Sequence, residues 1–277
     1  MILLHTMAVG TAGPRVAFLH GLFGQGRNWT QIAKGVAGPD GTEARCLLID
    51  LPDHGRSPWS AEFSYEGYAA HVADTLRAAA ATDGGSPQDP WVVVGHSLGG
   101  KVAMVLALTE PTLVDRLVVV DIAPKGYGDL HRFSGYIAAM QGLPLGKLTS
   151  RADADERFAI EVPDPGVRAF LLQNLRRHGD QWGWQANLEL IAADAALGTG
   201  SRIAGFPGHP GEHPAYEGSV LWIAGGDSEY IAQEDGPGMR AMFPRTRTLT
   251  VKGAGHWVHS DAPEIVVGAL RRFVAPR

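Results

Sequence analysis

The stretch that decides the fold reads Val92-Val93-Val94-Gly95-His96-Ser97-Leu98-Gly99-Gly100. Its apolar, β-branched start predicts a buried strand, and residues 101–109 after it suit a helix. Between the two lies Gly-x-Ser-x-Gly, a turn so tight that only small residues fit at Gly95 and Gly99. Such a turn lifts the Ser97 side chain above the sheet edge and points the backbone N–H of Leu98 at a developing oxyanion. Ser97 is therefore a candidate nucleophile, and Leu98 a candidate oxyanion donor.

A serine hydroxyl needs a neighbouring imidazole that takes its proton. Near the C-terminus, the predicted strand Thr248–Val251 leads into a glycine-rich loop that ends at His256. A parallel sheet presents such a loop at the same edge as the nucleophile. His256 is therefore the candidate general base, whereas His20 and His96 are expected to be wall or loop-anchoring residues.

A second oxyanion donor is expected from the loop after an earlier strand. The predicted strand Val16–Leu19 runs into His20-Gly21-Leu22-Phe23-Gly24. The two glycines allow this loop to bend so that a backbone N–H faces Ser97. We expect that donor to be Phe23, or else Leu22.

Composition narrows the class of protein. The chain has 277 residues, of which 45% are hydrophobic and 19% charged, as in an ordinary globular protein. Its net charge of −5 gives no basic surface for nucleic acid. Cys46 is the only cysteine and is expected to be a packing residue. No apolar run is long enough for a membrane span, and no secretory signal is evident, so a cytoplasmic protein is expected. We expect a monomer or a homodimer.

Short apolar runs alternate with longer Ala- and Leu-rich stretches along the chain, which predicts an α/β fold with a mostly parallel, doubly wound sheet. The predicted strands are Val16–Leu19, Cys46–Ile49, Trp91–Val94, Leu117–Val120, Val220–Ile223 and Thr248–Val251, and the predicted helices are Tyr65–Ala81, Leu98–Thr109, Glu234–Met242 and Pro263–Phe273.

One interval breaks this alternation. Residues 124–216 contain no convincing strand, which predicts an α-helical cap inserted into a core domain made of residues 1–123 and 217–277. A Gly- and Pro-rich stretch, Gly205–Gly218, is expected to return the chain to the sheet. The predicted cap helices are Phe133–Met140, Asp153–Ile160, Val167–Arg177 and Trp184–Ala196.

Together these motifs resemble the α/β-hydrolase family over essentially the whole chain. The family pattern includes His20-Gly21, the stretch Asp50 to Ser57, Ser97 in its turn and His256 last. The resemblance implies Ser-His-acid chemistry that needs neither a metal nor an organic cofactor. It leaves the identity of the acid open.

Two aspartates compete for the role of the acid. Most of the family places it in a Gly-x-x-Asp pattern after the cap, but here Gly225-Gly226-Asp227-Ser228 puts an aspartate one position early. The other candidate is Asp121, which ends the predicted strand next to the nucleophile's strand. If Asp227 has no catalytic role, it is a turn residue whose carboxylate caps local N–H groups.

A narrower resemblance favours Asp121. Residues 95–104, Val120 to Pro124, Trp182 to Leu188, Gly225 to Ile231 and Gly255 to His259 are similar to the YbfF-like esterase subfamily. That resemblance implies Asp121 as the acid, with Ser228 assisting the histidine.

The resulting hypothesis is a carboxylesterase-type serine hydrolase that acts on a small-molecule ester, of short to medium acyl chain, or a thioester. Hydrolysis of a carbon–carbon bond in a diketone uses the same residue set and stays an alternative. So does a non-enzymatic small-molecule receptor on the same fold. Dehalogenases and epoxide hydrolases of this fold have aspartate as nucleophile, so Ser97 argues against both.

Overall fold

A seven-stranded sheet forms the centre of the computed structural model, which describes residues 2–128, 130–207 and 211–275. The strand order is β1-β3-β2-β4-β5-β8-β9, and only β1 runs antiparallel to its neighbour. All six predicted strands are present, and β1 is an addition. The bounds are β1 Thr6–Val9, β2 Arg15–Leu19, β3 Arg45–Ile49, β4 Trp91–His96, β5 Val114–Val120, β8 Ser219–Gly225 and β9 Thr246–Val251.

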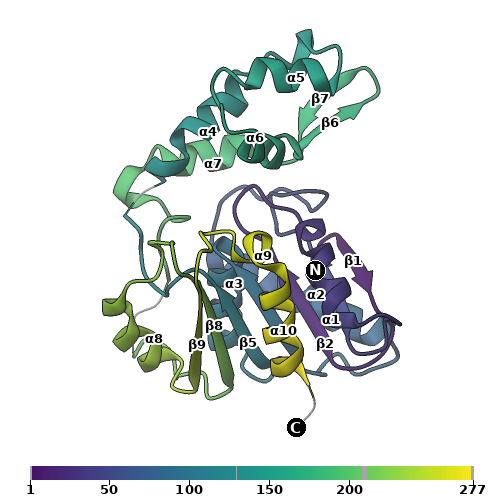
Figure 1. Ribbon diagram of the computed structural model, residues 1–277, viewed down its shortest axis with the longest axis vertical. Helices are drawn as coiled ribbons and strands as arrows, with labels where there is room; N and C mark the ends of the chain where they lie inside the picture. The colour runs from purple at the N-terminus through teal and green to yellow at the C-terminus, as the bar shows by residue number, and fades with distance from the viewer. Residues whose placement is uncertain (1, 129, 208–210, 276–277) are drawn as a thin grey trace.

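Helices cover both faces of this sheet (Figure 1). Successive strand residues point to opposite faces, so Phe18 and Leu48 pack with α1 and α10, whereas Leu19 and Ile49 pack with α2 and α3. Both faces are therefore buried, which explains the continuous apolar runs of the strands. The core helices are α1 Thr30–Ala37, α2 Tyr65–Thr82, α3 Leu98–Thr109, α8 Gly236–Met242, α9 Val258–Asp261 and α10 Pro263–Val274, and the short 3-10 turns are Gly26–Trp29 and Gln233–Asp235.

The chain between β5 and β8 rises away from the sheet as a separate layer (Figure 1). Part of the predicted return loop, residues 208–210, lies outside the described residues, as does residue 129. The elements of this layer are α4 His131–Gly142, α5 Arg151–Phe158, α6 Pro165–Leu172, β6 Leu175–His178, β7 Gln181–Trp184 and α7 Leu188–Ala195, with 3-10 turns at Leu145–Lys147 and Gly198–Gly200.

The expectation that this segment is purely helical is wrong. A two-stranded hairpin, β6 and β7, replaces the end of one predicted helix and the start of the next. Gly179 and Asp180 connect the two strands, and Gly179 has a positive φ of 60°. The helix α7 begins only after Asn187, whose side chain accepts a hydrogen bond from the backbone N–H of Leu190. Within the described residues, no helix is long and apolar enough to cross a membrane.

Candidate active site

Ser97 lies in the turn between β4 and α3, with φ 52° and ψ −118°. The turn is held to the neighbouring strand because the Ser97 N–H donates to the Val120 carbonyl at 3.1 Å. A Cβ at Gly95 would lie 2.2 Å from the Gly99 oxygen, and one at Gly99 would lie 2.5 Å from the His20 oxygen. Both glycines are therefore required by close backbone contacts, as the sequence predicts.

Asp121 and His256 meet beside this turn. The His256 Nδ1 lies 2.8 Å from Asp121 Oδ2, and the Asp121 side chain is fully buried. Asp121 follows β5 with a positive φ of 52°. An imidazole that donates its Nδ1 proton to a carboxylate keeps Nε2 as the proton acceptor. The pair can therefore act as an oriented base.

Two further donors surround the same carboxylate. The Gly225 N–H donates to Asp121 Oδ1 at 2.9 Å, and the Ser228 hydroxyl donates to Asp121 Oδ2. Asp227 is exposed, and its backbone N–H donates to the Ala254 carbonyl at 2.9 Å. The structure thus places Asp121 and Ser228, rather than Asp227, with His256.

The loop after β2 approaches Ser97 from the other side. Phe23 is buried and has a positive φ of 61°, which is rare for a bulky residue. Within the described chain, no hydrogen bond uses the backbone N–H of Phe23 or of Leu98. Both donors thus remain available for a substrate oxygen.

A residue that the sequence did not single out holds this loop. Asn174, which is fully buried at the start of the hairpin, donates from Nδ2 to the Phe23 carbonyl at 2.8 Å. Its Oδ1 accepts from Gln25 Nε2 at 3.0 Å. The inserted layer is therefore hydrogen-bonded directly to the loop that carries Phe23.

Tyr230 also went unnoticed in the sequence. Its ring stacks on the His256 imidazole, with centroids 3.9 Å apart and planes inclined by 20°. Tyr230 belongs to the stretch Gly225 to Ile231 that resembles YbfF-like esterases, but nothing in that stretch predicts a contact with His256.

The flanking histidines are loop anchors, as predicted. His96 lies beside Ser97, is buried, and has its Nε2 2.9 Å from the His256 carbonyl oxygen. Burial holds the His96 pKa well below its usual value, so the neutral ring donates from Nε2. His20 Nε2 accepts from the Leu51 N–H at 2.9 Å and thereby joins two loops.

The His96→Phe variant is expected to lower kcat about tenfold with little change in KM. The variant keeps a ring in place but loses one partly buried hydrogen bond to the loop that carries His256, worth about 1.4 kcal/mol. Steady-state kinetics would measure this loss, with His71→Phe on α2 as the control for a histidine-to-phenylalanine change. An unchanged kcat would show that His256 does not need this anchor.

Buried histidines should also make the fold sensitive to acid. Burial lowers the pKa of His20 to about 3 and that of His259 to about 4. Between about pH 4 and 6.5, the unfolded chain therefore binds more protons than the folded chain, and stability falls as the pH falls. Each such group changes the free energy of unfolding by up to about 1.4 kcal/mol per pH unit, a slope that is reached toward the lower end of this window.

Urea unfolding at pH 7, 6 and 5 would measure this slope. His259 stacks on Trp29 with ring centroids 4.4 Å apart, so His259→Phe keeps an aromatic contact and removes one titrating group. The variant is expected to show a shallower pH dependence than the unmodified chain. Equal slopes would contradict the prediction.

Two cavities meet at Ser97. Ser97, Leu22 and Phe133 line both, whereas His256 and Trp257 line only the first. Over residues 2–128, 130–207 and 211–275, no group of three or more His, Cys, Asp or Glu side chains is arranged to hold a metal ion. The site therefore combines a serine in a strained turn, a histidine in contact with a buried aspartate, and the backbone N–H groups of Leu98 and Phe23.

Known proteins resemble this chain over nearly its whole length. The alpha/beta hydrolase family matches residues 16–269. The sn-1-specific diacylglycerol lipase ABHD11 of Mus musculus is 36% identical over 269 residues, which cover 95% of this chain and 81% of that protein. Esterase YbfF of Escherichia coli (strain K12) is 29% identical, covering 94% of this chain and 92% of that protein. A solved marine microorganism esterase has a TM-score of 0.88 and 28% identity, covering 99% of this chain and 100% of that chain.

These findings confirm the predicted fold and the resemblance to YbfF-like esterases. They also confirm the enzyme class at the level of the family, because these relatives are named as esterases or a lipase. The chain therefore belongs to the alpha/beta hydrolase family.

Proposed function

We propose that the chain hydrolyses carboxylic esters of short to medium acyl length, or thioesters, through a covalent acyl-enzyme. The observation that carries the proposal is the contact between His256 and Asp121 beside the strained Ser97 turn. In this mechanism Ser97 attacks the carbonyl carbon as His256 takes its proton. His256 then gives that proton to the departing alcohol or thiol.

The other roles follow from the contacts around these three residues. The backbone N–H groups of Leu98 and Phe23 stabilise the oxyanion, and Ser228 supports Asp121. Water activated by His256 then attacks the acyl-enzyme and releases the acid. No step in this cycle requires a metal or an organic cofactor.

We also propose that residues 124–216 act as a cap over a core made of residues 1–123 and 217–277. The support is the hydrogen bond from Asn174 to the Phe23 loop, together with the cap residues Phe133 and Phe170 in the wall of the first cavity. The described part of this segment would then determine which esters fit.

Chromogenic p-nitrophenyl esters of increasing acyl length test the proposed reaction, with Ser97→Ala as the matched blank. Serine-dependent turnover with a length optimum would support it, and thioesters of the same acyl chains would establish which leaving atom is preferred. Absence of turnover on both series would refute it. Cleavage of a diketone would then favour carbon–carbon hydrolysis, and tight binding without turnover would favour a receptor.

A further inference from the structure

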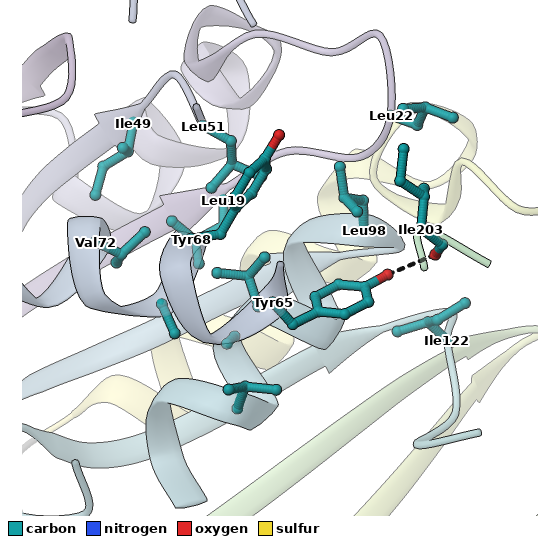
Figure 2. Close-up of a cluster of buried hydrophobic side chains, with 14 of the residues drawn as sticks. Leu19, Leu22, Ile49, Leu51, Tyr65, Tyr68, Val72, Leu98, Ile122 and Ile203 are labelled. Carbon is teal, nitrogen blue, oxygen red and sulfur yellow. Dashed lines mark hydrogen bonds between the residues drawn. The ribbon is translucent and has the colours of Figure 1, made fainter. Parts of the chain in front are cut away.

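The two cavities at Ser97 differ in character. The first is lined by aromatic and aliphatic side chains of the inserted layer together with His256. The second has a volume of about 180 Å³ and lies against α3, where Ser97, Leu98 and Lys101 line it. Figure 2 shows part of its apolar wall, with Tyr65, Leu98, Ile122 and Ile203 converging and the Tyr65 hydroxyl bonded to the Ile203 carbonyl.

The mechanism assigns one half of an ester to each cavity. His256 must give its proton to the leaving group, so the leaving group lies on the side of His256. That side is the first cavity, and His256 does not line the second. The second cavity therefore receives the acyl chain.

A buried lysine lies in the wall of this acyl cavity. Lys101 follows Ser97 by one helical turn, and only 3% of it is exposed. Its Nζ donates to the Ala204 carbonyl at 2.9 Å and to the Gly205 carbonyl. It lies 4.8 Å from the centre of the Tyr127 ring and 5.7 Å from that of Tyr65.

These contacts leave the ammonium group incompletely compensated. A protonated lysine has three donors, and the hydrogen bonds found in the described chain use two. None of the ion pairs between described residues includes Lys101, and burial lowers its pKa to about 7. A carboxylate brought into the cavity would accept the third hydrogen bond and restore charge balance.

Lys101 also ties the returning chain at Ala204 and Gly205 to α3, and a purely structural lysine would do the same. A structural tie needs no open space beside it, however, whereas this lysine lines a cavity that opens onto Ser97. Glu229 lines the same cavity but is exposed, so solvent screens its charge.

We infer that Lys101 is a specificity-determining residue, which selects esters whose acyl chain ends in a carboxylate. This inference rests on the proposed ester hydrolysis and names the chemistry of its acyl group. The substrate class is a monoester of a dicarboxylic acid, with the alcohol or thiol part in the first cavity and the free carboxylate at Lys101.

Selectivity between three p-nitrophenyl esters of similar length tests the inference. The acyl groups are suberate with a free carboxylate, the same acid capped as a methyl ester, and octanoate. We expect kcat/KM for the free carboxylate to exceed that for the capped ester about tenfold, because a hydrogen bond to a charged group is gained. If kcat/KM for the free carboxylate does not exceed that for the capped ester in the unmodified protein, the inference is wrong. Turnover of the octanoate ester would in that case still support the proposed ester hydrolysis. If the unmodified protein cleaves none of the three esters, both the inference and the proposed ester hydrolysis are wrong.

Variants at two lysines complete the test. Lys101→Met should bring the ratio of kcat/KM for the free carboxylate to that for the capped ester to about one. Lys125→Met is the matched control, because Lys125 also lies near the Tyr127 ring, at 5.2 Å, but pairs with Asp235 at 2.7 Å. Its ratio should equal that of the unmodified protein. If Lys101→Met does not fold, the preference of the unmodified protein for the free carboxylate still decides the test. If Lys101→Met folds and keeps that preference undiminished, Lys101 does not have the inferred role.

Discussion

Replacing Ser97 by alanine is expected to lower kcat by about six orders of magnitude. The hydroxyl is the only group that the variant removes. Loss of the nucleophile of a serine triad lowers kcat about as much as loss of the whole triad. The residual rate would come from binding and the N–H groups of Leu98 and Phe23. Turnover of the preferred ester, with active-site titration of the unmodified protein, would measure the ratio.

Ser228→Ala is the matched control for this substitution. It removes a second hydroxyl from the same site, one that donates to Asp121 rather than facing the substrate. We expect this variant to lose about tenfold in kcat, the effect of one partly buried hydrogen bond to a charged group. If Ser97→Ala lost no more than Ser228→Ala, the nucleophile would have to be another residue.

The meeting of Ser97 and His256 at one site was predictable from sequence because each lies in a turn or loop at the carboxyl end of a strand in a parallel sheet. The chain leaves such strands at one edge, so Ser97 after β4 and His256 after β9 had to come near each other. Local spacing alone could not choose the acid, since Asp121 and Asp227 both follow strands. The difference lies in three dimensions: Asp121 points into the site with a left-handed backbone, whereas Asp227 faces solvent.

The inserted layer was less predictable. Gly179-Asp180 is a recognised two-residue hairpin connection, so the sequence did contain a signal for β6 and β7. The surrounding Leu-, Arg- and Trp-rich stretch also suits a helix, and that interpretation was wrong. The roles of Asn174 and Tyr230 depend on contacts with residues more than 20 positions away in the sequence, which no local pattern encodes.

Asp121→Asn is expected to lower kcat about ten-thousandfold, whereas Asp227→Asn should lose less than about twofold. The Asp121 carboxylate receives hydrogen bonds from the Gly225 N–H and the Ser228 hydroxyl in addition to its contact with His256. An asparagine that keeps its oxygen on the Gly225 N–H turns its amide nitrogen toward His256 Nδ1. His256 Nδ1 must then accept a hydrogen bond from this amide, so the ring proton moves to Nε2. The imidazole can no longer take the proton of Ser97.

Kinetics of the two variants on one ester would measure the contrast between Asp121→Asn and Asp227→Asn. The reverse order would assign the acid to Asp227 and would require the loop after β8 to rearrange during catalysis, because Asp227 is exposed and its N–H is already bonded to the Ala254 carbonyl.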